Sequence, residues 1–287
     1  MANEVLSALV RLSIVATLGV LVMIPLRKPL RRAVGTEAAY WLWLFLPGSL
    51  LAVFLPRASA GVCGPDTLLS PVVNNCAMSV TLIWSIGAVA ALACFAYCQW
   101  LLRRSLGRLQ ERPDGTHWSP AARQPMLIGG WRPKIVLPGD FETRYSLTER
   151  ALVLAHERAH LARNDALTNT LASAIVCLFW FNPLVYWAWS RFRFDQEVAC
   201  DAAVLRQSKL SRRCYAQALA KTHVVGPAAI AFGWQRRHPL IERIAILKRP
   251  APSRTRRLMG YALALGLMLS GVYAVWSSVP GLPGGDG

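Results

Sequence analysis

The chain has 287 residues, of which 54% are hydrophobic and only 16% charged, and its formal net charge is +17. An ordinary soluble domain has about 25% charged residues, so this composition favours a membrane protein over a soluble one. No recognition helix or aromatic RNA-binding motif accompanies the basic residues, so we expect no direct contact with nucleic acid.

Four apolar runs are long enough to cross a bilayer, which takes about 20 mainly apolar residues. They cover residues 5–26, 38–56, 77–102 and 258–280. Lys and Arg gather directly after the first run, directly after the third and directly before the fourth. Because cytoplasmic loops of membrane proteins are enriched in Lys and Arg, we predict a multi-pass protein of the cytoplasmic (inner) membrane. Its N-terminus would be external. The loop that carries the first basic cluster and residues 103–257 would both be cytoplasmic.

Two cysteines, Cys63 and Cys76, lie in the loop between the second and third runs, which this topology makes external. Disulfides persist in oxidising compartments, and closing a loop restricts the unfolded chain. We therefore predict a disulfide between Cys63 and Cys76. The alternative is two unpaired thiols at the membrane edge.

The polar part of the chain contains a short β element and a capped helix. The stretch MLIGGWRPKIVL, residues 126–137, predicts two short strands around Gly129 and Gly130. Such strands could pair with an extended peptide by strand addition. Ser146 and Glu149 form a capping-box pattern, so we predict a helix from about residue 147 to about residue 162.

This helix carries the sequence His156-Glu157-Arg158-Ala159-His160. Histidines four residues apart lie on one face of a helix, so both rings can reach one zinc ion. Glu157 is placed to take a proton from the catalytic water, as in the HExxH motif of zinc peptidases. The alternative interpretation is a surface helix with Glu–Arg and His pairs.

A catalytic zinc has three protein ligands and one open position. Glu197, on a second helical pattern, is the natural third ligand, with Asp195 as the competing carboxylate. Asp201 lies one turn further and could accept a hydrogen bond from a ligating His ring. Arg163 and Asp165, directly after the HExxH helix, are candidates for the same supporting role. Further residues were weaker candidates: Cys200 as a buried small residue, and Tyr215 and Arg243 as oxyanion stabilisers.

A fifth apolar stretch, residues 166–190, is long enough to cross the membrane. A single crossing would put His156 and Glu197 on opposite sides. We therefore predict a re-entrant or buried helix pair that is broken at Asn182 and Pro183, because a residue before proline disfavours the helical conformation.

Four segments, HERAHLARND, FWFNPLVYW, DQEVACDAAVL and HPLIERIAIL, resemble the integral-membrane zinc metallopeptidase family of the BlaR/MecR β-lactam sensor-transducers. The resemblance covers about residues 120–250. It implies a cytoplasm-facing, gluzincin-like site with His156, His160 and Glu197 as zinc ligands and Glu157 as base. It also implies regulated proteolysis, typically of a transcriptional repressor. Those sensors carry an external penicillin-binding domain, whereas this sequence contains no Ser-x-x-Lys motif. We therefore expect that some other signal, or a separate sensor subunit, regulates the site.

We therefore expect a mainly α membrane protein with four transmembrane helices and a zinc peptidase domain that contains a small β element. The predicted divisions are residues 1–102 with three transmembrane helices, residues 103–257 with the peptidase, residues 258–280 with the last helix, and residues 281–287 as a flexible external tail.

The expected function is a zinc endopeptidase that cleaves a cytoplasmic or membrane-proximal protein in signal transduction. Its partners would be that substrate, the bilayer and a second copy of the chain in a homodimer. Two alternatives remain: a quality-control peptidase of the HtpX/Ste24 type, and a non-catalytic transducer with a structural zinc.

Overall fold

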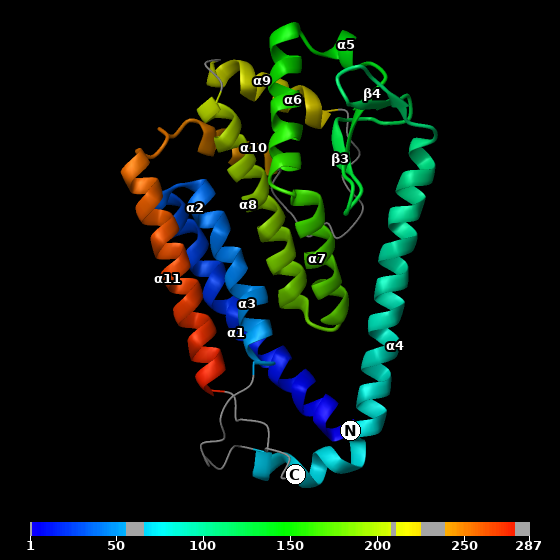
Figure 1. Ribbon diagram of the computed structural model, residues 1–287, viewed down its shortest axis with the longest axis vertical. Coiled ribbons are helices and arrows are strands. Elements are labelled where there is room, and N and C mark those ends of the chain that lie inside the picture. Colours follow the sequence, from blue (N-terminus) through cyan, green and yellow to red (C-terminus); the bar gives the residue numbers. More distant parts are fainter. Residues whose placement is uncertain (1, 56–65, 208–210, 225–238, 279–287) are drawn as a thin grey trace. The chain divides into compact units, whose positions relative to one another are not determined.

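The computed structural model describes residues 2–55, 66–207, 211–224 and 239–278 (Figure 1). The chain divides into two compact units. The first, called here the membrane unit, comprises Met1–Leu92, Cys177–Ala188 and Arg254–Gly287; the second, called the peptidase unit, comprises Ala93–Val176 and Trp189–Ser253. Helices dominate and the one sheet is small, which confirms the expected mainly α class. Cys63 lies outside the described residues, so its pairing with Cys76 stays a prediction.

The elements follow one another along the chain as follows: α1 (Ala2–Val34), α2 (Thr36–Trp41), the 3₁₀ turn η1 (Leu42–Leu44), α3 (Phe45–Ala52), α4 (Asp66–Leu106), β1 (Gln110–Glu111), β2 (His117–Ser119), β3 (Met126–Ile128), β4 (Lys134–Pro138), α5 (Phe141–Arg144), α6 (Leu147–Ala162), α7 (Asp165–Leu178), α8 (Pro183–Gln207), α9 (Arg212–Val224), α10 (Pro239–Leu247) and α11 (Arg254–Ser278).

Among the described residues, three helices are long and apolar enough to cross a membrane: Asn3–Val34 of α1, Ala77–Leu106 of α4, and α11. The first two contain the predicted runs 5–26 and 77–102 and extend beyond them, and α11 covers residues 258–278 of the fourth run. The basic residues 27–32, which we expected in a loop, form the last turns of α1. Leu, Lys and Arg are good helix formers, and cations are favourable at the C-terminal end of a helix. The helix therefore continues past the apolar run.

The predicted second crossing, residues 38–56, is not one continuous helix, so a fourth span is not confirmed. It divides into α2, η1 and α3. The 3₁₀ turn tightens the chain, and Pro47 in the first turn of α3 has no N–H to donate to a preceding carbonyl. Both α2 and α3 pack against α1 and α11, so neighbouring helices cover this interrupted backbone.

Glycines let α11 approach its neighbours in the membrane unit closely. A Cβ added at Gly260 would lie 2.6 Å from the Cβ of Val34 and 2.8 Å from the Cβ of Ala38. Small residues at such crossings allow two helix backbones to come together, which is common in membrane helix packing.

The turn between α7 and α8 lies where the sequence predicted a break. It belongs to the membrane unit. The Asn182 side chain accepts a hydrogen bond from the backbone N–H of Leu184 at 3.0 Å and donates to Thr17 at 3.0 Å. Trp84 of α4 donates its indole N–H to the carbonyl of Leu178 at 2.9 Å. These bonds satisfy polar groups that the interrupted helix leaves open, and they tie the turn to α1 and α4.

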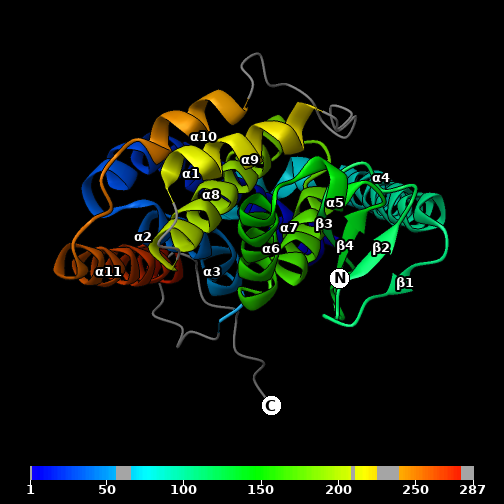
Figure 2. The ribbon, with the colours of Figure 1, turned by 90° about the horizontal axis from the view of Figure 1, so that it is seen from above.

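The peptidase unit contains one four-stranded sheet in the order β1-β2-β4-β3. The two short strands predicted around Gly129 and Gly130 are confirmed as β3 and β4, and they pair as an antiparallel hairpin, with Leu127 opposite Ile135. The strands β1 and β2 were not predicted, although Asp114 and Gly115 between them are a typical hairpin signal. Strand β3 lies at the edge of the sheet, and α6 packs against both β3 and β4 (Figure 2).

Two hydrophobic clusters hold α6 in place from two sides. Val153 of α6 packs in a cluster with Ile135 and Leu137 of β4. Leu152, the next residue along α6, packs in a cluster with Tyr215 of α9 and Leu247 of α10. A helix fixed on two sides by buried apolar residues provides a rigid support for side chains on its remaining faces.

Candidate metal centre

The helix that carries the HExxH sequence begins and ends at defined positions. Ser146 accepts a hydrogen bond from the backbone N–H of Glu149, and the Glu149 carboxylate accepts one from the backbone N–H of Ser146 at 2.8 Å. This capping box confirms the predicted helix, which runs from Leu147 to Ala162. The helical register places His156 and His160 on one face, with their Nε2 atoms 3.1 Å apart.

Glu197 of α8 faces both histidines. One carboxylate oxygen lies 3.4 Å from Nε2 of His156, and the other lies 3.6 Å from Nε2 of His160. The His side chains are 10% and 11% exposed, whereas that of Glu197 is 26% exposed. The group is therefore buried on the α6 side and accessible on the Glu197 side. Asp195, the competing carboxylate, is not part of this group.

The two histidine nitrogens and the Glu197 carboxylate have separations close to those in a tetrahedral zinc site. Zinc bonds to His nitrogen and carboxylate oxygen are about 2.0–2.2 Å long, so two ligand atoms of one tetrahedral ion lie about 3.3 Å apart. The two Nε2 atoms are 3.1 Å apart, and the Glu197 oxygens nearest to them, one for each histidine, lie at 3.4 and 3.6 Å. The donor set of two His and one Glu also leaves one position open, as in catalytic zinc sites.

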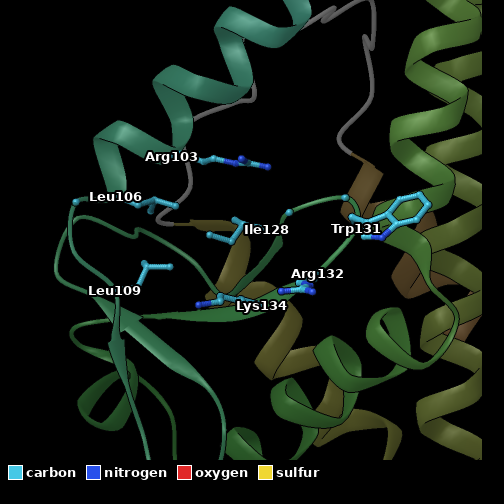
Figure 3. A pocket seen from close by; sticks show the side chains of 10 residues that line it. Arg103, Leu106, Leu109, Ile128, Trp131, Arg132 and Lys134 are labelled. Atoms are coloured by element: carbon cyan, nitrogen blue, oxygen red, sulfur yellow. The ribbon is translucent and has the colours of Figure 1, made fainter.

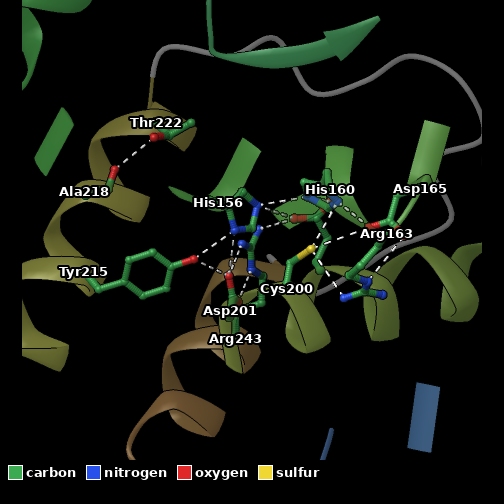
Figure 4. A network of polar contacts seen from close by, with 11 residues as sticks. His156, His160, Arg163, Asp165, Cys200, Asp201, Tyr215, Ala218, Thr222 and Arg243 are labelled. Atoms are coloured by element: carbon green, nitrogen blue, oxygen red, sulfur yellow. Dashed lines mark hydrogen bonds and ion pairs between the residues drawn. The ribbon is translucent and has the colours of Figure 1, made fainter. Parts of the chain in front are cut away.

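The partners of the two Nδ1 atoms indicate where the imidazole protons lie (Figure 4). Nδ1 of His160 lies 2.7 Å from the carboxylate of Asp165, and Nδ1 of His156 lies 2.9 Å from the hydroxyl of Tyr215. Tyr215 donates in turn to Asp201 at 2.7 Å. Each Nδ1 therefore carries a proton and donates it, as ligating histidines commonly do. Both Nε2 lone pairs then point toward the same place, an arrangement that a cation stabilises.

A tight turn after α6 brings the carboxylate of Asp165 to Nδ1 of His160. Asn164 has a φ of 55°, a left-handed conformation that Asn tolerates better than most residues and that commonly ends a helix. Arg163 lies 3.5 Å from Asp165 and donates to the sulfur of Cys200 at 3.4 Å. The sulfur of Cys200 is buried, 3.2 Å from Nδ1 of His160. Arg163 thus supports the site through Asp165 and Cys200.

Arg243 of α10 has a role that the sequence did not suggest. Its guanidinium donates to both oxygens of Asp201, at 2.9 and 2.7 Å, and lies 3.1 Å from Glu197. Tyr215 lies on the Nδ1 side of His156, away from Nε2. Both side chains hold the carboxylates that surround the histidines, and their role as oxyanion stabilisers stays a prediction. The distinctive segment HPLIERIAIL was a signal that α10 matters, but only packing shows which residue reaches the site.

The surroundings shift the pKa values of Glu157 and Glu197 in opposite directions. Burial raises the pKa of Glu157, although the nearby His156 and His160 oppose this effect. Burial would also raise the pKa of Glu197, but the charge of Arg243 and, after it, interactions with the neighbouring His160 and His156 outweigh it and hold that pKa well below its usual range. Two carboxylates with diverging pKa values are typical of sites where one is a base and the other stays ionised.

Comparison with known proteins identifies the family of the chain. Residues 64–247 match the sequence profile of the family described as BlaR1 peptidase M56. The chain is 38% identical over 88 residues to the "Regulatory protein BlaR1" of Bacillus licheniformis, an alignment that covers 31% of this chain and 14% of that protein.

It is also 32% identical over 82 residues to the "Methicillin resistance mecR1 protein" of Staphylococcus aureus and of Staphylococcus epidermidis, covering 29% of this chain and 14% of each relative. The aligned segments are thus small parts of these relatives. Because the family profile matches more than half of the chain, the protein belongs to the BlaR1 peptidase M56 family.

Proposed function

We propose that the protein is a membrane-embedded zinc endopeptidase that cleaves a cytoplasmic or membrane-proximal protein during signal transduction. The observation that carries the proposal is the convergence of His156, His160 and Glu197 at separations of 3.1, 3.4 and 3.6 Å. Membership of a metallopeptidase family and the three apolar helices support it.

The chain's own residues have distinct roles in the proposed reaction. His156, His160 and Glu197 hold the ion. When bound, zinc supplies Lewis acidity, which polarises the scissile carbonyl and makes water acidic near neutral pH. Glu157 takes the proton from the attacking water and delivers it to the leaving amine, a task that its raised pKa suits. Asp165, Tyr215 and Asp201 keep both imidazole rings in the orientation that ligation requires.

The position of β3 at the edge of the sheet favours the proposal that the substrate is a protein bound in extended form. Its outer edge carries no partner strand within the described sheet, and β3 packs against α6, which carries the HExxH sequence. A segment of substrate that adds to this edge would gain main-chain hydrogen bonds without a specific side-chain sequence. A transcriptional repressor is our proposed substrate.

The test begins with metal analysis of the purified full-length chain. We expect one zinc per chain in the wild type and in Glu157→Gln, and loss of zinc in His156→Ala, His160→Ala and Glu197→Ala. Full zinc occupancy in Glu197→Ala would refute its assignment as the third ligand.

Substrate trapping then tests activity. Glu157→Gln should retain its substrate and lose at least a hundredfold in turnover, and the captured protein should be cleaved by the wild type and spared when a chelator is present. Capture of one regulatory protein supports the proposal. Capture of many misfolded membrane proteins would favour the quality-control alternative, and chelator-resistant cleavage would contradict zinc catalysis.

A further inference from the structure

A second site in the peptidase unit has no role in the proposed reaction. A cavity of about 490 Å³ opens between the end of α4 and the turn that joins β3 to β4 (Figure 3). Arg103 and Leu106 line it from α4, and Ile128, Trp131, Arg132 and Lys134 line it from the hairpin. Its volume falls within the usual range of small-ligand sites, about 300–1,000 Å³.

Among the described residues, three cations and no carboxylate line the cavity. The cations are Arg103, Arg132 and Lys134. In the part of the chain that the structure describes, none of these three cations forms an ion pair, whereas Arg112, Arg144 and Arg243 all pair with carboxylates. Three cations around one cavity repel one another, and an anion between them would relieve that repulsion.

Apolar residues also line the cavity. Leu106 is buried in a cluster with Ala122 and Val136, and Ile128 packs against that cluster. The lining of the cavity therefore combines cationic and apolar residues. This combination fits a ligand that has both an anionic group and hydrocarbon, and it fits a free inorganic anion poorly.

The cavity lies at the end of a candidate membrane span. Helix α4 is apolar from Ala77 and ends at Leu106, with Arg103 and Arg104 in its last turn. Trp131 at the cavity mouth is 86% exposed, and Trp100 on α4 is 48% exposed. Exposed tryptophans and basic residues at the end of an apolar helix are typical of the bilayer interface, where lipid headgroups lie.

We propose that this cavity binds the phosphate headgroup of an anionic membrane phospholipid. Arg103, Arg132 and Lys134 contact the phosphate, while Leu106 and Ile128 contact the adjoining glycerol and upper acyl chain. Because Arg103 belongs to α4 and Arg132 to the β3–β4 turn, the bound headgroup links the helix end to the hairpin.

The test measures binding and local protection, neither of which depends on peptidase activity. The full chain in a nonionic detergent is titrated with a short-chain phosphatidylglycerol, with the matching phosphatidylcholine, and with inorganic phosphate. Amide hydrogen exchange is followed at residues 126–137. We expect saturable binding and slower exchange with phosphatidylglycerol only.

Two double variants that lose the same charge distinguish binding in this cavity from general electrostatic attraction of the lipid to the protein surface. Arg103→Gln with Arg132→Gln should weaken phosphatidylglycerol binding about tenfold or more, because each cation near an anionic headgroup strengthens binding. Arg104→Gln with Arg108→Gln loses the same two charges outside the cavity and should bind as the wild type does. Lys134→Gln serves as a second, single-site variant should the double variant unfold.

Equal loss in both double variants would overturn the proposal, as would unchanged binding in the cavity variants. Equal binding of inorganic phosphate would show that the site takes a free anion and not a lipid. Equal binding of phosphatidylcholine would show that the cations do not select the ligand.

Discussion

At the scale of single residues, the candidate centre depends on the residues that hydrogen-bond the proposed ligands as much as on the proposed ligands themselves. Asp201 accepts from Tyr215 and pairs with Arg243 through both oxygens, and all three side chains are buried. A buried carboxylate is tolerated only when charge and hydrogen bonds compensate it. This network therefore holds the acceptor of the His156 ring in one place.

Replacing Tyr215 with Phe should weaken zinc binding without removing a ligand. The change deletes the hydroxyl that accepts from Nδ1 of His156, and loss of such partners typically lowers metal affinity about 10–100-fold. Competition with a chelator of known affinity measures this. The control is Tyr145→Phe, because Tyr145 is also 1% exposed but bonds Thr222. An equal loss of affinity in both variants would indicate general destabilisation.

The sequence alone predicts which residues of the candidate centre share a helix face, but it does not predict how Arg243 reaches them. His156 and His160 share a helix face, and Glu197 and Asp201 are one turn apart on another helix, so the helical period alone predicts each pair. The structure brings these pairs together, and their role in binding zinc stays a prediction. Arg243 comes from a separate helix, and no local period relates it to the others. Only packing of α10 beside α9 brings it to Asp201.

At the scale of elements, helices with local start and stop signals were predicted best. For α6, the capping box and Asn164 set both ends, so the predicted bounds agree with the structure. The end of α1 and the interrupted stretch from α2 to α3 were predicted less well. Their course depends on packing against other helices, which hydropathy along the chain does not record.

The cap of α6 should make stability depend on pH in the acid range. Burial would raise the pKa of Glu149, but Lys221, at 2.7 Å, and the backbone N–H of Ser146 outweigh it and lower that pKa. A lowered folded-state pKa stabilises the fold above the unfolded-state value of about 4.3, and this stability is lost as the pH falls through the folded-state pKa.

Glu149→Gln should therefore show a smaller decrease in thermal midpoint than the wild type between about pH 6 and pH 3.5. The control is Glu142→Gln, which removes a glutamate of the same unit that is paired with Arg112 at the surface. Surface pairs contribute little to stability, so this variant should follow the wild-type profile. Identical profiles for all three proteins would contradict the role of the buried cap.

The contact of α11 with its neighbours should be sensitive to one added methyl group. Gly260→Ala would place a Cβ 2.6 Å from the Cβ of Val34, and neither atom can move by side-chain rotation. We expect a loss of about 1–3 kcal/mol in the free energy of unfolding. Gly266→Ala in the same helix meets no atom within 4 Å and should be neutral or slightly stabilising, since Ala favours helix more than Gly. Thermal unfolding in detergent distinguishes the two, and equal midpoints would contradict the close approach.

At the scale of the whole molecule, the number of crossings decides on which side each part of the chain lies. In the described part of the chain, three continuous helices are candidate spans. With three crossings, the basic ends of α1 and α4 would lie on opposite sides of the membrane, against the usual distribution of Lys and Arg. With four, both basic ends and the basic start of α11 lie in the cytoplasm. The stretch from α2 to α3 would supply the fourth crossing, and interrupted backbone is tolerated at membrane depth where protein covers it.

Reporter fusions test this choice directly. We expect a reporter fused after Gly35, directly beyond α1, and a reporter fused after Arg108, directly beyond α4, both to read cytoplasmic, because the last turns of both helices carry Arg and cytoplasmic flanks retain positive charge. A fusion within residues 57–65 should read external and is the internal control, since it differs from the Gly35 fusion only by the interrupted stretch. If the Gly35 and Arg108 fusions report opposite sides, the stretch from α2 to α3 does not cross and the protein has three spans. If both read external, the orientation is reversed and the proposed centre faces away from any cytoplasmic substrate.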